Sequence, residues 1–206
     1  MDVQNNKEQV PFEHYVTRYR VLDPGETARR CGVAFDEAAG VFTLRLLDAE
    51  YRLHWPEYAI ESDDAGAFAL RNVPCQTFLL RFLLEGSAAK VSNRFVTFRE
   101  MPWGEMYIQP YTGRCLTRAA FTFGTRVAAF RAACGKMGAL ALGHGDAGFE
   151  FTLLPGYRMQ IMVWEGDDEF PPNSQILYTE NFAEGFAAED RVVAGDILIS
   201  AIKQRM

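Results

Sequence analysis

The sequence predicts an α+β fold, in which one antiparallel sheet built from two hairpins, about 33–55 and 147–164, is covered by a long central helix and further helices. In both hairpin segments apolar and polar residues alternate, which is typical of half-buried strands. Over about 112–136, apolar residues recur three and four apart, which is typical of a helix. A chain of 206 residues lies within the usual size of a domain, so we expect one globular domain over residues 1–206.

The composition is that of a globular protein, with 49% hydrophobic and 23% charged residues and a net charge of −6. The negative charge excludes a general nucleic-acid binder, which needs a positive surface to displace counterions from phosphates. No window approaches the roughly 18 apolar residues of a membrane span, and the first ten residues are polar or isolated apolar ones. We therefore expect a cytoplasmic protein that does not bind membranes.

The cysteines are Cys31, Cys75, Cys115 and Cys134. They are far apart in the sequence and form no CxxC pair, so neither a zinc knuckle nor a clustered iron–sulfur ligand set is present. In a reducing cytoplasm, we expect four buried free thiols.

Local signals define the elements of the first half. The spacing of aromatic and aliphatic residues predicts a helix over 12–22. A short helix follows, because Asp23 is a suitable N-cap and Gly32 suits the position after the C-terminus. The hairpin 33–55 comes next, and the apolar run 74–85 predicts a helix buried in the core.

The second half begins with the helix over 112–136. Its predicted apolar seam consists of Leu116, Ala120, Phe123, Val127, Phe130, Cys134 and Met137. Gly124 lies inside this helix, where glycine is unfavourable, so we expect close packing against another backbone there. The last helix begins at Glu189 and Asp190 and ends near Arg205, so its charges complement the helix dipole.

The second hairpin turns at Pro155-Gly156, between the alternating runs 149–153 and 157–161. Antiparallel pairing would bring the residues before the first run and after the second to the same end. The polar residues that would meet there are His144, Asp146, Asp167, Asp168 and Glu169. One imidazole with several carboxylates suits Mg²⁺, Ca²⁺ or Mn²⁺ better than zinc. The simpler alternative is that short polar residues fill the turns.

Residues 143–148 read GHGDAG, which formally matches the dinucleotide-binding pattern G-x-G-x-x-G. That site needs a helix whose N-terminus receives the pyrophosphate directly after the glycines. Here Phe149 and Phe151 begin a strand, so we do not expect a nucleotide site.

Exposed aromatic and basic side chains predict a ligand or partner surface. It would include Trp103, Tyr107, Arg114, Arg118 and Trp164. The loop MPWGEMYIQPY is rich in apolar residues for a surface, and it would contact a partner or cover a pocket unless it folds onto the core. Charges between 111 and 145 are all basic, whereas those between 146 and 190 are almost all acidic. This contrast fits attraction within the fold or, alternatively, a basic helix that binds an anionic ligand or partner.

The segment 144–180 also carries a resemblance. Its F-E-F strand, central proline, Trp164-Glu165-Gly166 and the following DDEFPP turn resemble the C-terminal signature of the domain of unknown function 3786 family of anaerobic bacteria and archaea. The PWGEMY segment, Phe123-Gly124 and Glu189-Asp190 also match, so the likeness covers most of the chain. The resemblance implies no assigned chemistry. Some relatives are labelled iron–sulfur proteins because of clustered cysteines near the N-terminus, which this sequence lacks.

These observations predict a non-catalytic accessory protein of an anaerobe that binds an unidentified protein or small molecule. The alternative is a divalent-metal-dependent enzyme, for example a hydrolase, that uses His144, Asp146 and the turn 167–169. No cofactor is predicted. A divalent cation belongs only to the alternative, and an iron–sulfur cluster is not expected.

Overall fold

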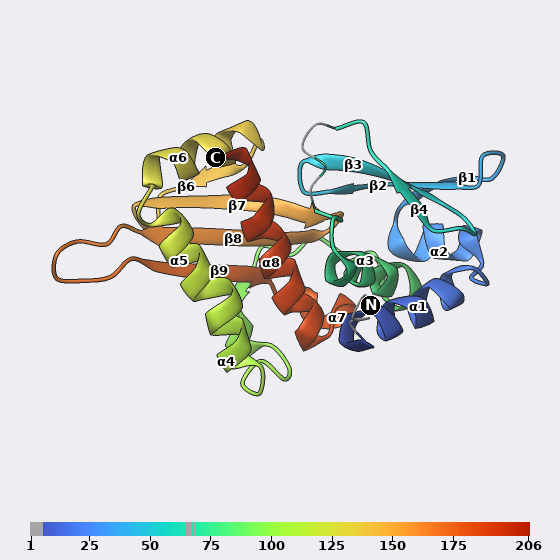
Figure 1. Cartoon of the computed structure of the whole chain (residues 1–206), viewed down its shortest axis with the longest axis horizontal. Helices are drawn as coiled ribbons and strands as arrows, with labels where there is room; N and C mark the ends of the chain where they lie inside the picture. Colours follow the sequence, from blue (N-terminus) through green and yellow to red (C-terminus); the bar gives the residue numbers. More distant parts are fainter. Residues whose placement is uncertain (1–5, 65–66, 68) are drawn as a thin grey trace, which may run out of the picture. The chain divides into compact units, whose positions relative to one another are not determined.

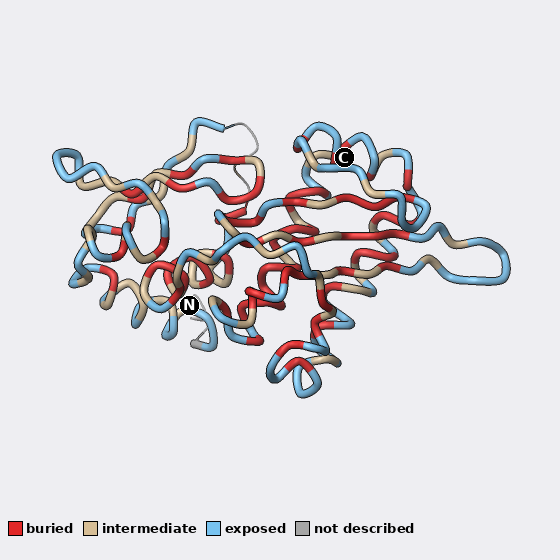
Figure 2. The backbone as a smooth tube through the Cα atoms, turned by 180° about the vertical axis from the view of Figure 1, so that it is seen from behind, coloured by how far each residue is buried: buried red, intermediate tan, exposed pale blue. Residues whose placement is uncertain are grey.

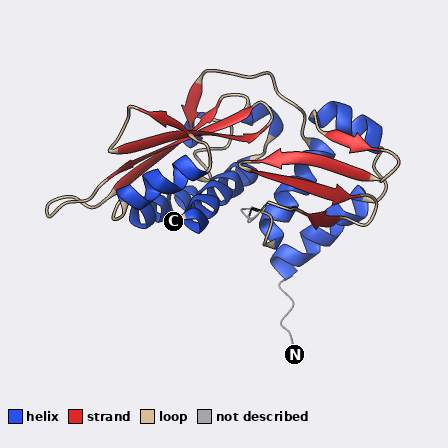
Figure 3. Cartoon of the chain, turned by 90° about the horizontal axis from the view of Figure 1, so that it is seen from above, coloured by secondary structure: helices blue, strands red, loops and turns tan. Residues whose placement is uncertain are grey.

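The computed structural model describes residues 6–64, 67 and 69–206, and the chain divides into two compact units, residues 1–88 and 89–206. Each unit combines helices with an antiparallel sheet of its own, so the predicted α+β class is confirmed (Figures 1 and 3). The prediction of one shared sheet is wrong, because each hairpin pairs with edge strands from its own half of the chain. The single domain over residues 1–206 stays a prediction.

The first unit contains three helices and four strands within the described residues. They are α1 (Asn6–Tyr19), α2 (Pro24–Cys31), β1 (Ala34–Asp36), β2 (Val41–Leu46), β3 (Ala49–His54), β4 (Ala59–Glu61) and α3 (Val73–Glu85). The strands lie in sequence order, β1-β2-β3-β4. The predicted hairpin is therefore the centre of this sheet.

One face of this sheet is apolar, as the alternation predicts. Phe42 pairs with Leu53 and Leu44 with Tyr51, and all four are buried. Most apolar residues of α3 are also buried and contribute to the core of this unit, as expected for a helix that is hydrophobic on most sides.

The predicted ends of α2 are confirmed. The carboxylate Oδ1 of Asp23 accepts a hydrogen bond from the backbone N–H of Glu26 at 2.8 Å, and therefore caps the helix. Gly32 ends the helix with a φ of 65°, a left-handed conformation that glycine adopts without strain.

The second unit contains a larger sheet with the strand order β5-β9-β8-β7-β6. Its strands are β5 (Phe95–Thr97), β6 (Leu140–Leu142), β7 (Ala147–Leu154), β8 (Tyr157–Trp164) and β9 (Asn173–Thr179). Its helical segments are η1 (Phe98–Glu100), α4 (Ile108–Tyr111), η2 (Thr112–Thr117), α5 (Arg118–Phe123), α6 (Val127–Lys136), α7 (Phe182–Gly185) and α8 (Ala188–Arg205). Figure 1 shows α5 and α8 crossing one face of this sheet.

The second hairpin is confirmed as β7 and β8, which pair from Ala147↔Val163 to Leu154↔Tyr157. The turn uses Gly156 at a φ of 86°, which an L side chain rarely adopts. A bulge between Thr152 and Leu154 precedes the turn.

The single long helix predicted over 112–136 is wrong, because the chain breaks between α5 and α6. A Cβ at Gly124 would lie 2.9 Å from the carbonyl oxygen of Trp164 and 2.5 Å from the Cβ of Pro172. The close backbone approach expected at Gly124 is therefore confirmed, and it coincides with the break. Arg126 then takes a non-helical conformation, with φ −147° and ψ 46°, before α6 begins.

Most residues of α8 are buried. Figure 2 shows that buried stretches also run along the strands of the larger sheet. Of the seam predicted on the central helix, every residue is buried except Leu116, which is half-buried. In the part of the chain that is described, no helix is both long enough and apolar enough to cross a membrane.

Candidate functional site

The connection from η1 to α4, the loop Met101–Tyr107, exposes three large apolar side chains. The exposed fractions are 68% for Trp103, 73% for Met106 and 39% for Tyr107, whereas Met101 is buried. Trp103 and Tyr107 were predicted as part of a partner surface, and the structure places them together on this loop. Such a cluster is unusual on a protein surface without a partner.

Hydrogen bonds fix the conformation of the loop Met101–Tyr107. At its start, the Glu100 carboxylate accepts bonds from the backbone N–H and the hydroxyl group of Thr97, both at 2.7 Å. Within the loop, the backbone N–H of Gly104 donates to the Met101 carbonyl oxygen at 2.9 Å. The exposed side chains therefore project from an ordered turn.

The backbone of Trp103 lies in the left-handed region, with a φ of 63°. This conformation costs a residue other than glycine about 1–2 kcal/mol. The next residue must be glycine, since a Cβ at Gly104 would lie 2.9 Å from the Met101 carbonyl oxygen and still closer to that of Phe98. Strain of this kind persists only where the surrounding structure holds it in place.

Arg191, on the first turn of α8, holds the loop Met101–Tyr107 from inside the unit. Its side chain is 1% exposed, and its Nη2 donates to the Pro102 carbonyl oxygen at 2.5 Å. Its Nε donates to the Ala187 carbonyl oxygen at 3.3 Å, and its guanidinium group lies 5.7 Å from the centre of the Phe98 ring. Burial lowers the pKa of the Arg191 guanidinium.

Arg191 was not among the predicted site residues. The signal that could have found it is a basic residue followed by the apolar run Val192 to Ala194, in a helix whose residues are mostly apolar. An arginine in such a position is seldom buried without a specific partner. Its partner, the Pro102 carbonyl, lies far away in the sequence, so the sequence alone could not have named it.

Arg114 and Arg118 were predicted to belong to the same surface, but the structure pairs both with Asp196 of α8. Arg118 Nη1 contacts Asp196 Oδ1, and its Nη2 donates to the Ser200 hydroxyl at 2.9 Å. Arg114 Nη2 lies 3.6 Å from Asp196 Oδ2. We expected electrostatic attraction between the basic helix and the acidic second hairpin. These two arginines instead form ion pairs with Asp196 of α8.

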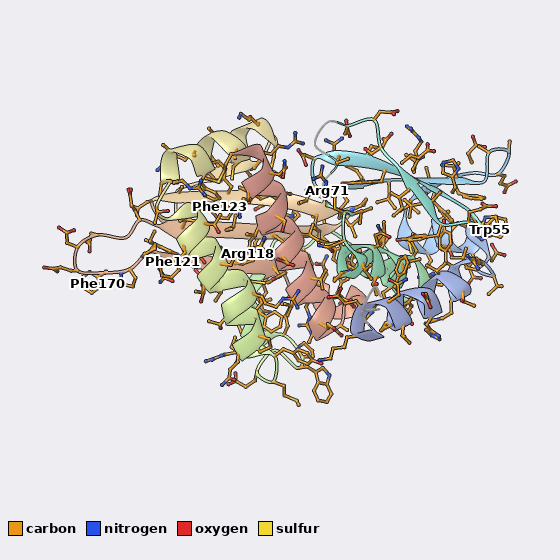
Figure 4. All side chains as sticks on the ribbon, in the orientation of Figure 1. Trp55, Arg71, Arg118, Phe121, Phe123 and Phe170 are labelled. Atoms are coloured by element: carbon orange, nitrogen blue, oxygen red, sulfur yellow. The ribbon has the colours of Figure 1, made fainter. Side chains whose placement is uncertain are left out.

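Trp164, the remaining residue of the predicted surface, lies at the end of β8 and is 36% exposed. It begins the connection to β9, whose exposed Phe170 is labelled in Figure 4 together with Phe121 on α5. Figure 1 shows this connection projecting from one end of the sheet, away from the loop that precedes α4. The predicted surface residues therefore do not form one continuous patch.

The two ends of the second hairpin meet, as predicted. Asp146 Oδ2 accepts a hydrogen bond from the backbone N–H of Glu165 at 2.8 Å. Asp167 Oδ1 accepts bonds from the backbone N–H groups of Glu169 at 2.9 Å and Phe170 at 2.7 Å. These two carboxylates therefore complete the turns.

Across residues 6–64, 67 and 69–206, no three His, Cys, Asp or Glu side chains come together as a group that could hold a metal ion. His144, Asp168 and Glu169, the other residues proposed for this site, are exposed. The divalent-cation site stays a prediction.

None of the four cysteines forms a disulfide bond, and all four are buried. Burial raises the pKa of the Cys115 thiol to about 12, and it raises the pKa values of Cys31 and Cys134 as well. The thiolate is the nucleophilic form of cysteine. These three side chains are therefore structural, apolar residues.

A comparison with protein-family models matches residues 23–201 to the family described as Domain of unknown function (DUF3786). The chain belongs to this family. The resemblance noted in the segment 144–180 is thereby confirmed, and both Arg191 and the loop Met101–Tyr107 lie within the matched part of the DUF3786 domain. A search of curated proteins found no match, and a search of solved structures found none either.

Proposed function

We propose that this DUF3786 protein is a non-catalytic accessory protein that binds a partner protein through the loop Met101–Tyr107. The observation that carries the proposal is the combination of Trp103, 68% exposed at a φ of 63°, with a buried arginine that holds the neighbouring carbonyl group. A strained, exposed and anchored tryptophan has no evident role in the stability of the fold. Strain of this kind is concentrated at functional sites.

The chemistry of the loop favours a protein partner with an apolar pocket. Tryptophan, tyrosine and methionine are enriched at the centres of protein interfaces, where a few such side chains supply most of the binding energy. Two charged residues of the loop region, Arg99 and Glu105, pair with each other at 3.0 Å, and the third, Glu100, is acidic. This surface therefore lacks the positive excess that nucleic acids or anionic membranes attract.

The fixed conformation of the loop supports high affinity. A side chain that is already held in its bound position loses little conformational entropy on association. Arg191, the Glu100 cap and Gly104 together provide this constraint. The partner would therefore accept Trp103 as a preformed convex group.

The proposal is tested by capturing a partner with the full chain and measuring the affinity of that partner for the wild type and for matched variants. The tagged wild-type protein is used to capture a partner from cells, and the purified partner is then titrated by calorimetry. We expect Trp103→Ala to weaken binding at least about tenfold, which is the effect of a moderate interface hot spot. Phe121→Ala removes an aromatic side chain that is 57% exposed elsewhere in the same unit, and it should leave the affinity unchanged.

A further variant distinguishes the effect of the strained backbone at Trp103 from the effect of its side chain on binding. Trp103→Gly removes the side chain and also the cost of the left-handed backbone, so it should bind as weakly as Trp103→Ala while being at least as stable as it. Equal affinities of wild type and Trp103→Ala would contradict the proposal. If sedimentation shows that the wild type self-associates and that Trp103→Ala abolishes this association, the partner of the loop Met101–Tyr107 is instead a second copy of the chain.

A further inference from the structure

The first unit contains a pocket of about 410 Å³ that lies outside the site described above. It is formed by the beginning of α2, the turn between β1 and β2, and the residue after β3. Its walls include Asp23, Arg29, Phe35, Glu37, Gly40 and Trp55. Figure 4 labels Trp55 at this end of the first unit. The volume is within the range of small-molecule sites, about 300–1,000 Å³.

Two aromatic side chains form the apolar part of the pocket, and both are held in place. The indole Nε1 of Trp55 donates a hydrogen bond to the Tyr19 carbonyl oxygen at 3.2 Å, so its polar atom is satisfied. Phe35 packs against Phe42, with 4.6 Å between the ring centres. Both Trp55 and Phe35 are only half-buried, so part of each ring is open to the pocket.

The turn that carries Glu37 has a defined conformation. Asp36 Oδ1 accepts hydrogen bonds from the backbone N–H groups of Ala38 at 2.9 Å and Ala39 at 3.1 Å. Gly40 closes the turn with a φ of 66°, and its carbonyl oxygen accepts a bond from the Trp55 backbone N–H at 2.8 Å. Glu37 is therefore presented from a fixed backbone beside the aromatic wall.

One cation and one anion in this pocket remain without partners. Arg29 and Glu37 make no hydrogen bond or ion pair within the described residues, although both line the pocket. Asp23, the other acidic residue, already accepts a hydrogen bond from Glu26 as the cap of α2. A guanidinium group binds a carboxylate with two parallel hydrogen bonds, and a carboxylate binds an ammonium group.

We propose that this pocket binds a free amino acid with an apolar or aromatic side chain. Arg29 would bind the ligand carboxylate, Glu37 would bind the ammonium group, and the side chain would lie against Trp55 and Phe35. This occupant fits the pocket because it brings both missing charges and an apolar group of suitable size. The proposal concerns a different unit from the loop Met101–Tyr107 and stands independently of it.

The experiment is a thermal-shift screen of the full chain against the standard amino acids, followed by calorimetry with the strongest ligand. We expect an apolar or aromatic amino acid to bind. Its decarboxylated amine and its deaminated acid, each lacking one charge, should bind at least about tenfold more weakly. The proposal would be overturned if no amino acid raised the melting temperature, or if the amine bound as tightly as the amino acid.

Variants then assign the two charges. Arg29→Gln should weaken binding of the amino acid at least about tenfold and leave binding of the amine unchanged. Glu37→Gln should weaken binding of the amine and leave binding of the deaminated acid unchanged. Arg20→Gln is the matched control, because Arg20 is exposed in the same unit and does not line the pocket. Equal effects of Arg29→Gln and Arg20→Gln would contradict the assignment. Trp103→Ala should leave amino-acid binding unchanged, so the two proposals fail separately.

Discussion

Nη2 of Arg191 donates a hydrogen bond to the carbonyl oxygen of Pro102 at 2.5 Å, across 89 positions of sequence. Nε of the same side chain holds the Ala187 carbonyl oxygen before α8, at 3.3 Å. One buried cation therefore ties the start of the last helix to the loop that exposes Trp103. Loss of this side chain should affect the loop more than the sheet.

Arg191→Met tests this relationship, because methionine fills similar space without donating hydrogen bonds. We expect a loss of about 1–3 kcal/mol in the free energy of unfolding, since the carbonyl groups of Pro102 and Ala187 lose a charged donor. Hydrogen exchange at the Gly104 amide should become faster as the loop loosens. Arg99→Met is the control, because Arg99 forms a surface pair with Glu105, and it should change stability by less than about 0.5 kcal/mol.

Alanine should have opposite effects on stability at Gly124, in the break between α5 and α6, and at Gly135, within α6. Gly124→Ala should lower the free energy of unfolding by about 1–3 kcal/mol, because its Cβ would lie 2.9 Å from the Trp164 carbonyl oxygen and 2.5 Å from Pro172. Gly135→Ala meets nothing within 4 Å on α6, and it should raise that free energy by about 0.5–1 kcal/mol. Urea denaturation measures both, and a stabilising Gly124→Ala would refute the close contact.

The pH dependence of stability should reveal the cap at Glu100. Hydrogen bonds from the Thr97 backbone N–H and then from its hydroxyl group hold the pKa of the Glu100 carboxyl below its usual value. A carboxyl with a lowered folded pKa stabilises the protein above its unfolded pKa, and the contribution disappears as pH falls through the folded pKa. The stability difference between wild type and Glu100→Gln should therefore be largest near neutral pH and shrink in acid. A difference independent of pH would contradict this role.

Divalent cations test the metal-dependent alternative. Asp146 and Asp167 already accept backbone hydrogen bonds, so we expect no change in melting temperature with millimolar Mg²⁺, Mn²⁺ or Ca²⁺. A ligand that binds only the folded state would raise that temperature. If one of these ions raises it and Asp146→Ala abolishes the increase, the metal site near His144 gains support.

Local signals in the sequence predicted the elements that depend on a few neighbouring residues. The cap at Asp23, the C-terminal Gly32 and the turn at Pro155-Gly156 all involve contacts within a few positions, and all three are confirmed. Their backbone conformations follow from the residue types themselves.

Features that depend on distant residues could not be predicted in the same way. The two hairpins lie in separate sheets because β4 and β9, rather than each other, provide the neighbouring strands. Asp196 forms an ion pair with Arg118, and the Trp164 carbonyl oxygen lies close to Gly124. Both contacts join residues that are far apart in the sequence. Periodicity shows which face of an element is buried, but it does not show which element covers that face.

The connection between β8 and β9 closes its own turn through Asp167, while its base is held where Trp164 and Pro172 meet Gly124. The turn at its tip is therefore closed by hydrogen bonds among its own residues. Insertions and deletions between Asp168 and Phe170 would be tolerated during divergence, and a peptide tag placed there would leave the rest of the domain intact.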